Sequence, residues 1–217
     1  MYKLAVFDLD GTLFDTLPDL LPAFNAAVEA YGYAPCPTER FGQVIGNGYQ
    51  TSLRRILPPD FDNEEQFKAM CRIYHETYHA HYADHTYAYA GIRQALRRLQ
   101  DHGVKMAVLS NKTEEHSQFL CQKLLPDISF CGVYGAGSGY PLKPAPDYLQ
   151  KILNDHGVSH AEAIFIGDSN VDVYTAHNAD MPCIGCEWGY RGREELRQAG
   201  ADLLASTPAQ MVDLILK

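Results

Sequence analysis

Residues 3–16 read KLAVFDLDGTLFDT, a short apolar run that ends in two aspartates and a Gly-Thr pair. The run 3–9 has the composition of a strand buried on both faces, as in parallel sheets. Helical patterns separate it from later runs, and strand-helix alternation predicts an α/β fold with a doubly wound parallel sheet. The later strand-like runs are 104–109, 130–134, 163–166 and 182–184.

The segment 15–85 interrupts this alternation, because it holds helical patterns and no strand-like run. An apolar stripe over 20–28 predicts a helix that ends before Gly32, and further helices are expected over 47–57 and 64–82. We therefore expect a small all-helical cap domain, 15–85, inserted after the first strand of an α/β core formed by 1–14 and 86–217.

The charge balance of the chain limits its partners. With 18 Lys and Arg against 27 Asp and Glu in 217 residues, the formal net charge is -9. Such a surface repels phosphate backbones, which argues against nucleic-acid binding. The sequence holds no apolar run long enough to cross a bilayer and no signal peptide at its start, so we expect a cytoplasmic protein, monomeric or weakly dimeric.

Chemically active side chains follow the predicted strands, at the edge where open parallel sheets bind ligands. Singly, each residue also suits a structural role such as a helix cap or a surface charge. Together they bring four carboxylates, a hydroxyl, an amide and an ammonium to one edge. The residues are Asp8, Asp10, Ser110, Asn111, Lys143, Asp168 and Asp172.

This set of groups indicates phosphoryl transfer. Several carboxylates close together repel one another, and a bound Mg²⁺ relieves the repulsion. The metal and Lys143 would stabilise the charge of a transferring phosphoryl group. Asp8 is placed to attack phosphorus, and Asp10 to protonate the leaving oxygen and later deprotonate water. The predicted substrate is a small phosphorylated metabolite.

Four motifs in order carry a resemblance to the haloacid dehalogenase-like hydrolases: DLDGTLFDT at 8–16, SN at 110–111, KPAP at 143–146 and GDSNVD at 167–172. The resemblance spans the chain and implies the following roles. Asp8 would be the nucleophile and a ligand of Mg²⁺, together with Asp168. Asp10 would be the general acid and base and would bind Mg²⁺ through its backbone carbonyl. Asp172 would support the metal site, while Ser110, Asn111 and Lys143 would bind the phosphoryl group.

Within the family, two further segments are similar to phosphoglycolate phosphatases: IGNG at 45–48 and WGY at 188–190. Asn47 and Arg54 are accordingly expected to contribute to substrate specificity, and 2-phosphoglycolate is the leading substrate. A sugar-phosphate mutase, a pyrophosphatase and a nucleotide phosphatase of the same fold remain open, as does a binding module that has lost turnover.

Two other groups of potential ligands lie outside these motifs. The segment HETYHAHYADH brings together His75, His79, His81 and His85, which we interpret as a polar helix face rather than a metal site. Cys183 and Cys186 have CxxC spacing in a strand-like run without a second such pair. We interpret both as buried thiols, and metal binding by either group is left undecided.

Overall fold

The computed structural model describes residues 1–217 and divides the chain into two compact units. The core unit comprises Met1–Asp15 and Ala88–Lys217, and the cap unit comprises Thr16–Tyr87. The boundaries predicted from the sequence were 14/15 and 85/86. None of the helices combines the length and the apolar character that crossing a membrane requires.

The core unit is built on a six-stranded parallel sheet in the order β5-β4-β1-β6-β7-β8. The chain starts in the middle strand, moves outward in one direction to β5, and then crosses to the other side of β1. This reversal makes β1 and β6 the switch point at which such sheets bind ligands. The strands are β1 (Leu4–Phe7), β4 (Lys105–Thr113), β5 (Gly132–Ala136), β6 (Ala163–Gly167), β7 (Cys183–Cys186) and β8 (Leu203–Ala205).

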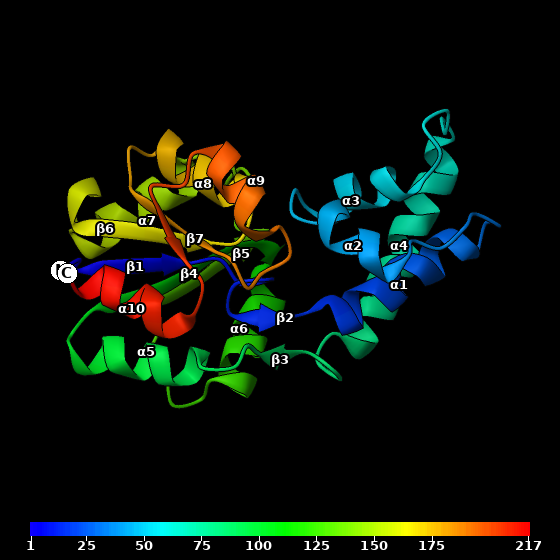
Figure 1. Cartoon of the computed structure of the whole chain (residues 1–217). Coiled ribbons are helices and arrows are strands. Elements are labelled where there is room, and N and C mark those ends of the chain that lie inside the picture. Colours follow the sequence, from blue (N-terminus) through cyan, green and yellow to red (C-terminus); the bar gives the residue numbers. More distant parts are fainter. The chain divides into compact units, whose positions relative to one another are not determined.

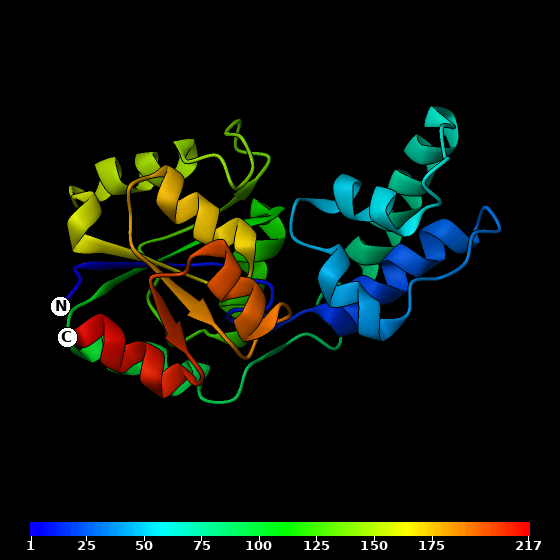
Figure 2. The same cartoon turned by 45° about the horizontal axis from the view of Figure 1, so that its top comes forward.

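Helices cover both faces of this sheet, which confirms the predicted doubly wound fold (Figures 1 and 2). One layer holds α5, α6 and α10, and the other holds α7, α8 and α9. Their bounds are α5 (Ile92–Asp101), α6 (Glu114–Leu124), α7 (Asp147–His156), α8 (Asn170–Asn178), α9 (Gly192–Ala199) and α10 (Pro208–Leu216), with a 3₁₀ turn at His160–Glu162.

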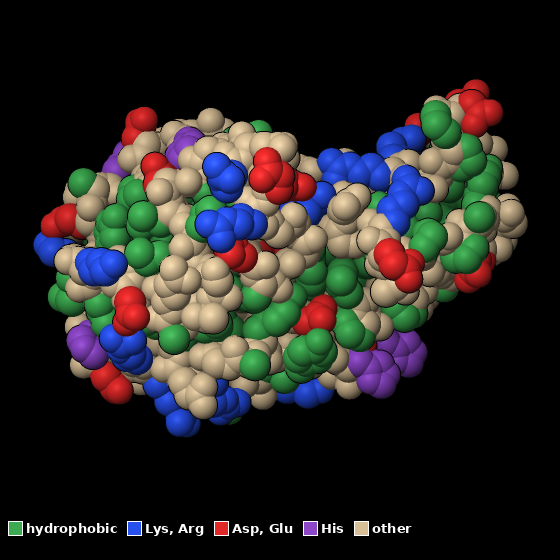
Figure 3. All heavy atoms as spheres, in the orientation of Figure 1, with side chains coloured by type: hydrophobic (Ala, Val, Ile, Leu, Met, Phe, Trp, Pro, Cys, Tyr) green, Lys and Arg blue, Asp and Glu red, His purple; other side chains and the backbone are tan.

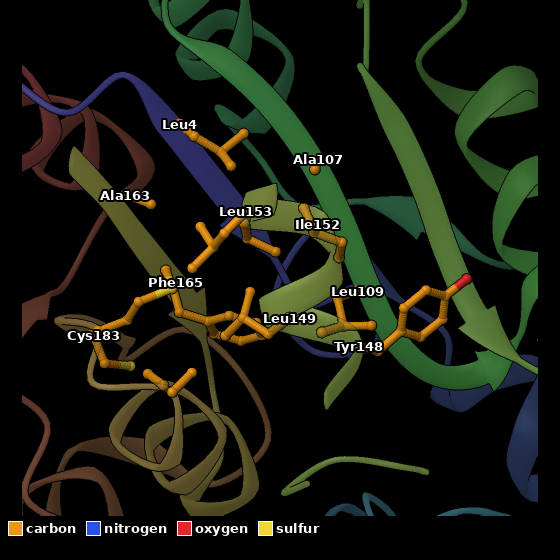
Figure 4. Packing of buried hydrophobic residues seen from close by; sticks show 14 of the residues in the cluster. Leu4, Ala107, Leu109, Tyr148, Leu149, Ile152, Leu153, Ala163, Phe165 and Cys183 are labelled. Atoms are coloured by element: carbon orange, nitrogen blue, oxygen red, sulfur yellow. The ribbon is translucent and has the colours of Figure 1, made fainter. Parts of the chain in front are cut away.

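Alternate residues of the strands pack against α7 in the centre of the core unit (Figure 4). Leu4, Ala107 and Phe165 come from three neighbouring strands and meet Leu149 and Leu153 of the helix. Successive side chains of a strand point to opposite faces, so the intervening residues serve the other helical layer. This double burial explains why the strands read as continuous apolar runs.

The strands differ from the predicted runs mainly at their ends. β4 continues to Thr113 and β7 to Cys186, through polar or small residues that hydropathy alone excludes. β8 was not predicted, because it is only Leu203–Ala205 and lies beside polar residues. Its pairing with β7 supplies the stability that its own sequence does not indicate.

The cap unit is helical, and α1 packs along α4 through aromatic rings such as Phe24 and Tyr74, whose centroids lie 4.4 Å apart. A buried carboxylate ties the two ends of this unit together: Asp19 accepts hydrogen bonds from the backbone N of His85 and from the N and Oγ1 of Thr86, at 2.9, 2.8 and 2.7 Å. The helices are α1 (Leu17–Glu29), α2 (Thr38–Val44), α3 (Tyr49–Ile56) and α4 (Glu64–His81), and β2 (Phe14–Asp15) pairs with β3 (Tyr87–Ala88) where the chain passes between the units.

Candidate active site

Asp8 and Asp10 lie directly after β1. The backbone N of Asp8 still donates to Ile166 O at 2.8 Å, as in the sheet, and its side chain is buried. The chain then turns at Gly11, whose φ of +86° strains any residue with a Cβ. A Cβ at this position would also lie 2.4 Å from Asp168 Oδ2. Gly11 therefore allows both the turn and the close approach of Asp168.

A bulge in β4 presents Ser110 and Asn111. The pairing with β5 shifts in register between Leu109 and Thr113, and such bulges redirect side chains beside active sites. Ser110 is buried. The side chain of Asn111 spans the backbone of Lys143: its Nδ2 donates to the carbonyl O at 3.0 Å, and its Oδ1 accepts from the N at 2.8 Å. Asn111 thus fixes the loop of Lys143, and phosphate binding by Asn111 stays a prediction.

Lys143 joins two carboxylates that lie far apart in sequence. Its Nζ is 2.7 Å from Asp8 Oδ1 and 2.6 Å from Asp172 Oδ1, and the lysine side chain is only 4% exposed. Because the ammonium is shielded from water, both interactions act in surroundings of low dielectric constant and are strong. The predicted gathering of these three residues is thus present in the structure.

Asp168 and Asp172 follow β6. Asp168 Oδ1 accepts from Thr12 Oγ1 at 3.3 Å, which connects it to the turn after β1. Asp172 sits in the first turn of α8, where its Oδ2 accepts from the N and Oγ of Ser169 at 3.0 and 2.7 Å. A carboxylate at this position stabilises the helix N-terminus. Its Oδ1 remains directed to Lys143.

The electrostatics of the site are dominated by burial. Burial, together with the nearby Asp172 and Asp10 carboxylates, raises the pKa of Asp8 from 3.8 to about 7, although Lys143 opposes the rise. Burial and the Asp172 and Asp8 charges likewise raise the pKa of Asp168 well above its usual value. Burial alone would lower the pKa of Lys143, but Asp172 and Asp8 outweigh it and raise that pKa.

These carboxylates fit a divalent cation. Asp8, Asp168 and Asp172 each offer an oxygen, and the three oxygens lie within 4.8 Å of one another. The raised pKa values of Asp8 and Asp168 mark an excess of buried negative charge, which a hard cation with oxygen ligands would offset. The side chain of Asp10 is not part of this group. The resemblance to the family gives only the Asp10 backbone carbonyl a role as ligand.

The segment after β7 contributes to the site in a way that the sequence did not reveal. The indole Nε1 of Trp188 donates to Thr12 O at 3.0 Å, and the backbone N of Tyr190 donates to Asp168 Oδ2 at 2.7 Å. The Tyr190 hydroxyl lies 3.3 Å from Asp15 Oδ1. The WGY segment therefore holds both the turn after β1 and the carboxylate after β6.

In the cap unit, the two adjacent arginines of α3 have different partners. Arg54 pairs with Glu64 at 2.7 Å and lies over the Phe67 ring, whereas Arg55 donates to Val44 O at 2.9 Å and to Asn47 Oδ1 at 2.7 Å. Figure 3 shows Lys and Arg side chains gathered over this part of the cap unit. The contact of Arg55 with the 45–48 loop was not predicted, because two adjacent arginines look alike in sequence.

The histidine and cysteine groups show no arrangement of metal ligands. No set of three or more such donors apart from the aspartate group lies within 4.8 Å. In α4, His75 packs against the ring of Tyr49 with centroids 4.4 Å apart. Cys183 and Cys186 are buried in β7, and burial raises the pKa of both thiols well above the usual value. Residues three apart on a strand point to opposite faces, which prevents shared ligation.

The doubly wound sheet, with aspartates after β1 and β6 and a lysine between them, is the arrangement expected of a phosphoryl-transfer hydrolase. The sequence model of the haloacid dehalogenase-like hydrolases matches residues 5–186, and the chain belongs to this family. The family that the four motifs predicted is thereby confirmed.

Several similar proteins within the family are named phosphoglycolate phosphatases. The chain is 31% identical to a phosphoglycolate phosphatase of Pseudomonas putida, over 97% of this chain and 76% of the relative. It is 29% identical to that of Vibrio parahaemolyticus, over 98% and 96%. A crystal structure of a predicted phosphoglycolate phosphatase from Haemophilus somnus superposes with a TM-score of 0.90 at 25% identity, covering 98% of this chain and 97% of the other.

Proposed function

We propose that the chain is a magnesium-dependent phosphatase that hydrolyses 2-phosphoglycolate through a phospho-aspartate on Asp8. The observation that carries this proposal is the arrangement of Lys143 between Asp8 and Asp172, beside Asp168. It supplies a buried carboxylate nucleophile, a fixed cation and a place for a divalent metal at the switch point of the sheet.

The nucleophile is prepared by its contact with Lys143. The ammonium holds Asp8 Oδ1, so that Oδ2 is the oxygen directed at phosphorus. Asp8 Oδ2 forms a bond to phosphorus, the ester P–O bond breaks, and a proton from Asp10 passes to the leaving oxygen. Asp10 then takes a proton from water as the water oxygen attacks phosphorus, which releases phosphate and restores Asp8. Ser110, Asn111 and Lys143 bind the phosphoryl oxygens during both steps.

Mg²⁺ would be held by the Asp8 and Asp168 carboxylates and the backbone carbonyl of Asp10, and when bound it offsets their charge and that of the phosphoryl group. Asp172 would not bind the metal itself. It holds the Lys143 ammonium with Oδ1 and accepts from the Ser169 N at the start of α8 with Oδ2. The Tyr190 backbone amide fixes Asp168 Oδ2, so Oδ1, which also accepts from Thr12 Oγ1, is the oxygen that would bind the metal.

The choice of phosphoglycolate rests on the relatives, several of which carry that name. In the cap unit, Asn47 is our candidate for recognition of the substrate carboxylate, because an amide NH₂ donates to anions. Arg54 is the weaker candidate, since Glu64 already neutralises its charge.

The test is phosphate release from a panel containing phosphoglycolate, pyrophosphate, a nucleoside monophosphate and sugar phosphates, with Mg²⁺ or with EDTA. We expect Mg²⁺-dependent release that is greatest for phosphoglycolate and is abolished in Asp8→Asn. Conversion between sugar-phosphate isomers with little release would instead establish a mutase. No release from any ester would reject the phosphatase.

A further inference from the structure

A second buried lysine lies beside the site, and the mechanism above does not use it. The Lys112 side chain is 4% exposed, and its Nζ lies 3.1 Å from Asp10 Oδ1. We propose that Lys112 is a positioning residue, whose ammonium holds the Asp10 carboxylate in the orientation from which it protonates the leaving oxygen. This inference rests on the proposed phosphatase function. It gives a role in that function to a residue that lies outside the four motifs.

Lys112 lies in the bulge of β4, and its side chain reaches Asp10 after β1. β4 pairs with β5 at Leu109 and Tyr134 and next at Thr113 and Ala136, so residues 110–112 stand opposite residue 135 alone. The bulge is closed by a hydrogen bond from the Lys112 N to Ser110 Oγ at 3.2 Å. The backbone that presents Ser110 to the phosphoryl group therefore also fixes the base of the Lys112 side chain.

The charges of the two side chains explain why they pair. A buried ammonium without a counter-ion is strongly unfavourable, so Lys112 requires an anion within reach. Asp10 forms an isolated bridge with Phe14 at the start of the turn after β1, and its carboxylate is 20% exposed. A carboxylate in such a turn can rotate unless a partner holds it. Lys112 supplies such a partner, because its ammonium lies 3.1 Å from Asp10 Oδ1 and its side chain is buried.

The role of Lys112 is confined to the step in which Asp10 acts as the acid. In that step Asp8 bonds to phosphorus, the ester P–O bond breaks, and the proton of Asp10 moves to the leaving oxygen. Lys112 keeps all its protons throughout. A leaving group that departs easily as an anion needs little protonation, whereas a poor leaving group depends on it. Loss of Lys112 should therefore lower kcat/KM mainly for esters with poor leaving groups.

The experiment compares phenyl phosphate, which has the poorer leaving group, with 4-nitrophenyl phosphate of similar shape. In Lys112→Met we expect kcat/KM to fall about 10- to 100-fold for phenyl phosphate and about threefold or less for the nitrophenyl ester. Lys112→Arg, which keeps the charge, should recover part of the loss. Lys123→Met, on the exposed face of α6, is the matched control and should leave both esters unaffected.

A double-mutant cycle decides whether Lys112 acts through Asp10. In an Asp10→Asn background, Lys112→Met should cause no further loss with phenyl phosphate. Equal losses for the two esters, or a full additional loss in that background, would overturn the proposal and indicate direct phosphate binding or a general structural role. Lys112→Gln replaces Lys112→Met in the comparison if the latter does not fold. A wild type that hydrolyses no ester would instead reject the phosphatase, and this proposal with it.

Discussion

Gly189 and Asp168 are in such close contact that a side chain in place of the glycine would force one of them to move: a Cβ at residue 189 would lie 2.2 Å from the Asp168 Cβ and 2.5 Å from its Oδ2. Real side-chain atoms do not approach so closely, so a substitution must displace one of the two segments. The chain after β7 thus determines the position of a carboxylate that belongs to the end of β6.

Gly189→Ala should weaken metal binding more than it weakens the fold. Because Asp168 must move away from the added methyl group, we expect the Mg²⁺ concentration for half-maximal activity to rise at least about tenfold, as for changes in groups that orient ligands. Calorimetric titration of Mg²⁺ measures the same quantity without substrate. The control is Gly139→Ala, whose φ of +88° brings strain but no contact. It should cost about 1 kcal/mol of stability and leave Mg²⁺ affinity unchanged; equal Mg²⁺ affinity in both variants would contradict the prediction.

Lys143→Met should remove activity almost completely. Without the ammonium, Asp8 loses its fixed orientation and the phosphoryl charge loses a buried partner, so kcat should fall by about 10³-fold or more. Lys151→Met removes an exposed lysine of α7 that pairs with Asp155, and we expect wild-type kinetics there. Phosphate-release assays on both variants provide the comparison. A Lys143→Met enzyme that retains a tenth of the wild-type kcat would exclude the proposed role.

The stability of the metal-free protein should depend on pH through Asp8. Its pKa is about 7 in the folded chain and 3.8 in its ordinary state, so between these values the folded state binds the proton more tightly. The resulting stabilisation is complete below about pH 4 and is lost as the pH rises through about 7. We therefore expect Tm in EDTA to fall across this range, by an amount equivalent to a few kcal/mol at most.

Two comparisons check this assignment by thermal unfolding. Asp8→Asn has no charge to lose at this position, so its Tm should change less with pH. Saturating Mg²⁺ should raise the wild-type Tm near neutral pH, because the cation binds the ionised site of the folded state. A pH dependence that is identical in wild type and Asp8→Asn would show that the titrating group lies elsewhere.

The adjacent arginines of α3 should differ in their effect on the 45–48 loop. Arg55 donates to Val44 O and Asn47 Oδ1, so Arg55→Met should raise hydrogen exchange in this loop about fivefold, the equivalent of one lost hydrogen bond of about 1 kcal/mol. Arg54→Met should leave the loop unchanged, because Arg54 contacts Glu64 and Phe67 instead. Exchange that rises equally in both variants would contradict this difference.

The sequence was informative where local pattern and chemistry coincide. The apolar runs located the central strands, and the aspartates after them could be placed at one edge because parallel strands end together. The Asp8 and Asp168 carboxylates and the Lys143 ammonium were found in this way, and the structure brings them into one cluster.

Contacts that depend on tertiary packing could not be predicted. Lys112 carries no signal of burial, since an isolated lysine is usually exposed. Tyr190 contacts Asp168 through its backbone N–H, which nearly every residue type possesses, so the sequence does not reveal this contact. The short helix α2 and the three-residue strand β8 are stabilised by their neighbours rather than by their own sequences.

The hydrogen bonds that Asp19 accepts from His85 and Thr86 make the cap unit structurally independent at its two ends. These bonds join a residue near the start of the unit to two residues near its end, so contacts within the unit hold the entry and exit of the chain together. Segment 16–87 is thus an insert whose ends are joined by its own contacts. Such an insert can be lengthened or exchanged without altering the register of the sheet. Exchange of this one continuous stretch of gene would therefore leave the residues at the edge of the sheet, Asp8, Lys143 and Asp168, in place.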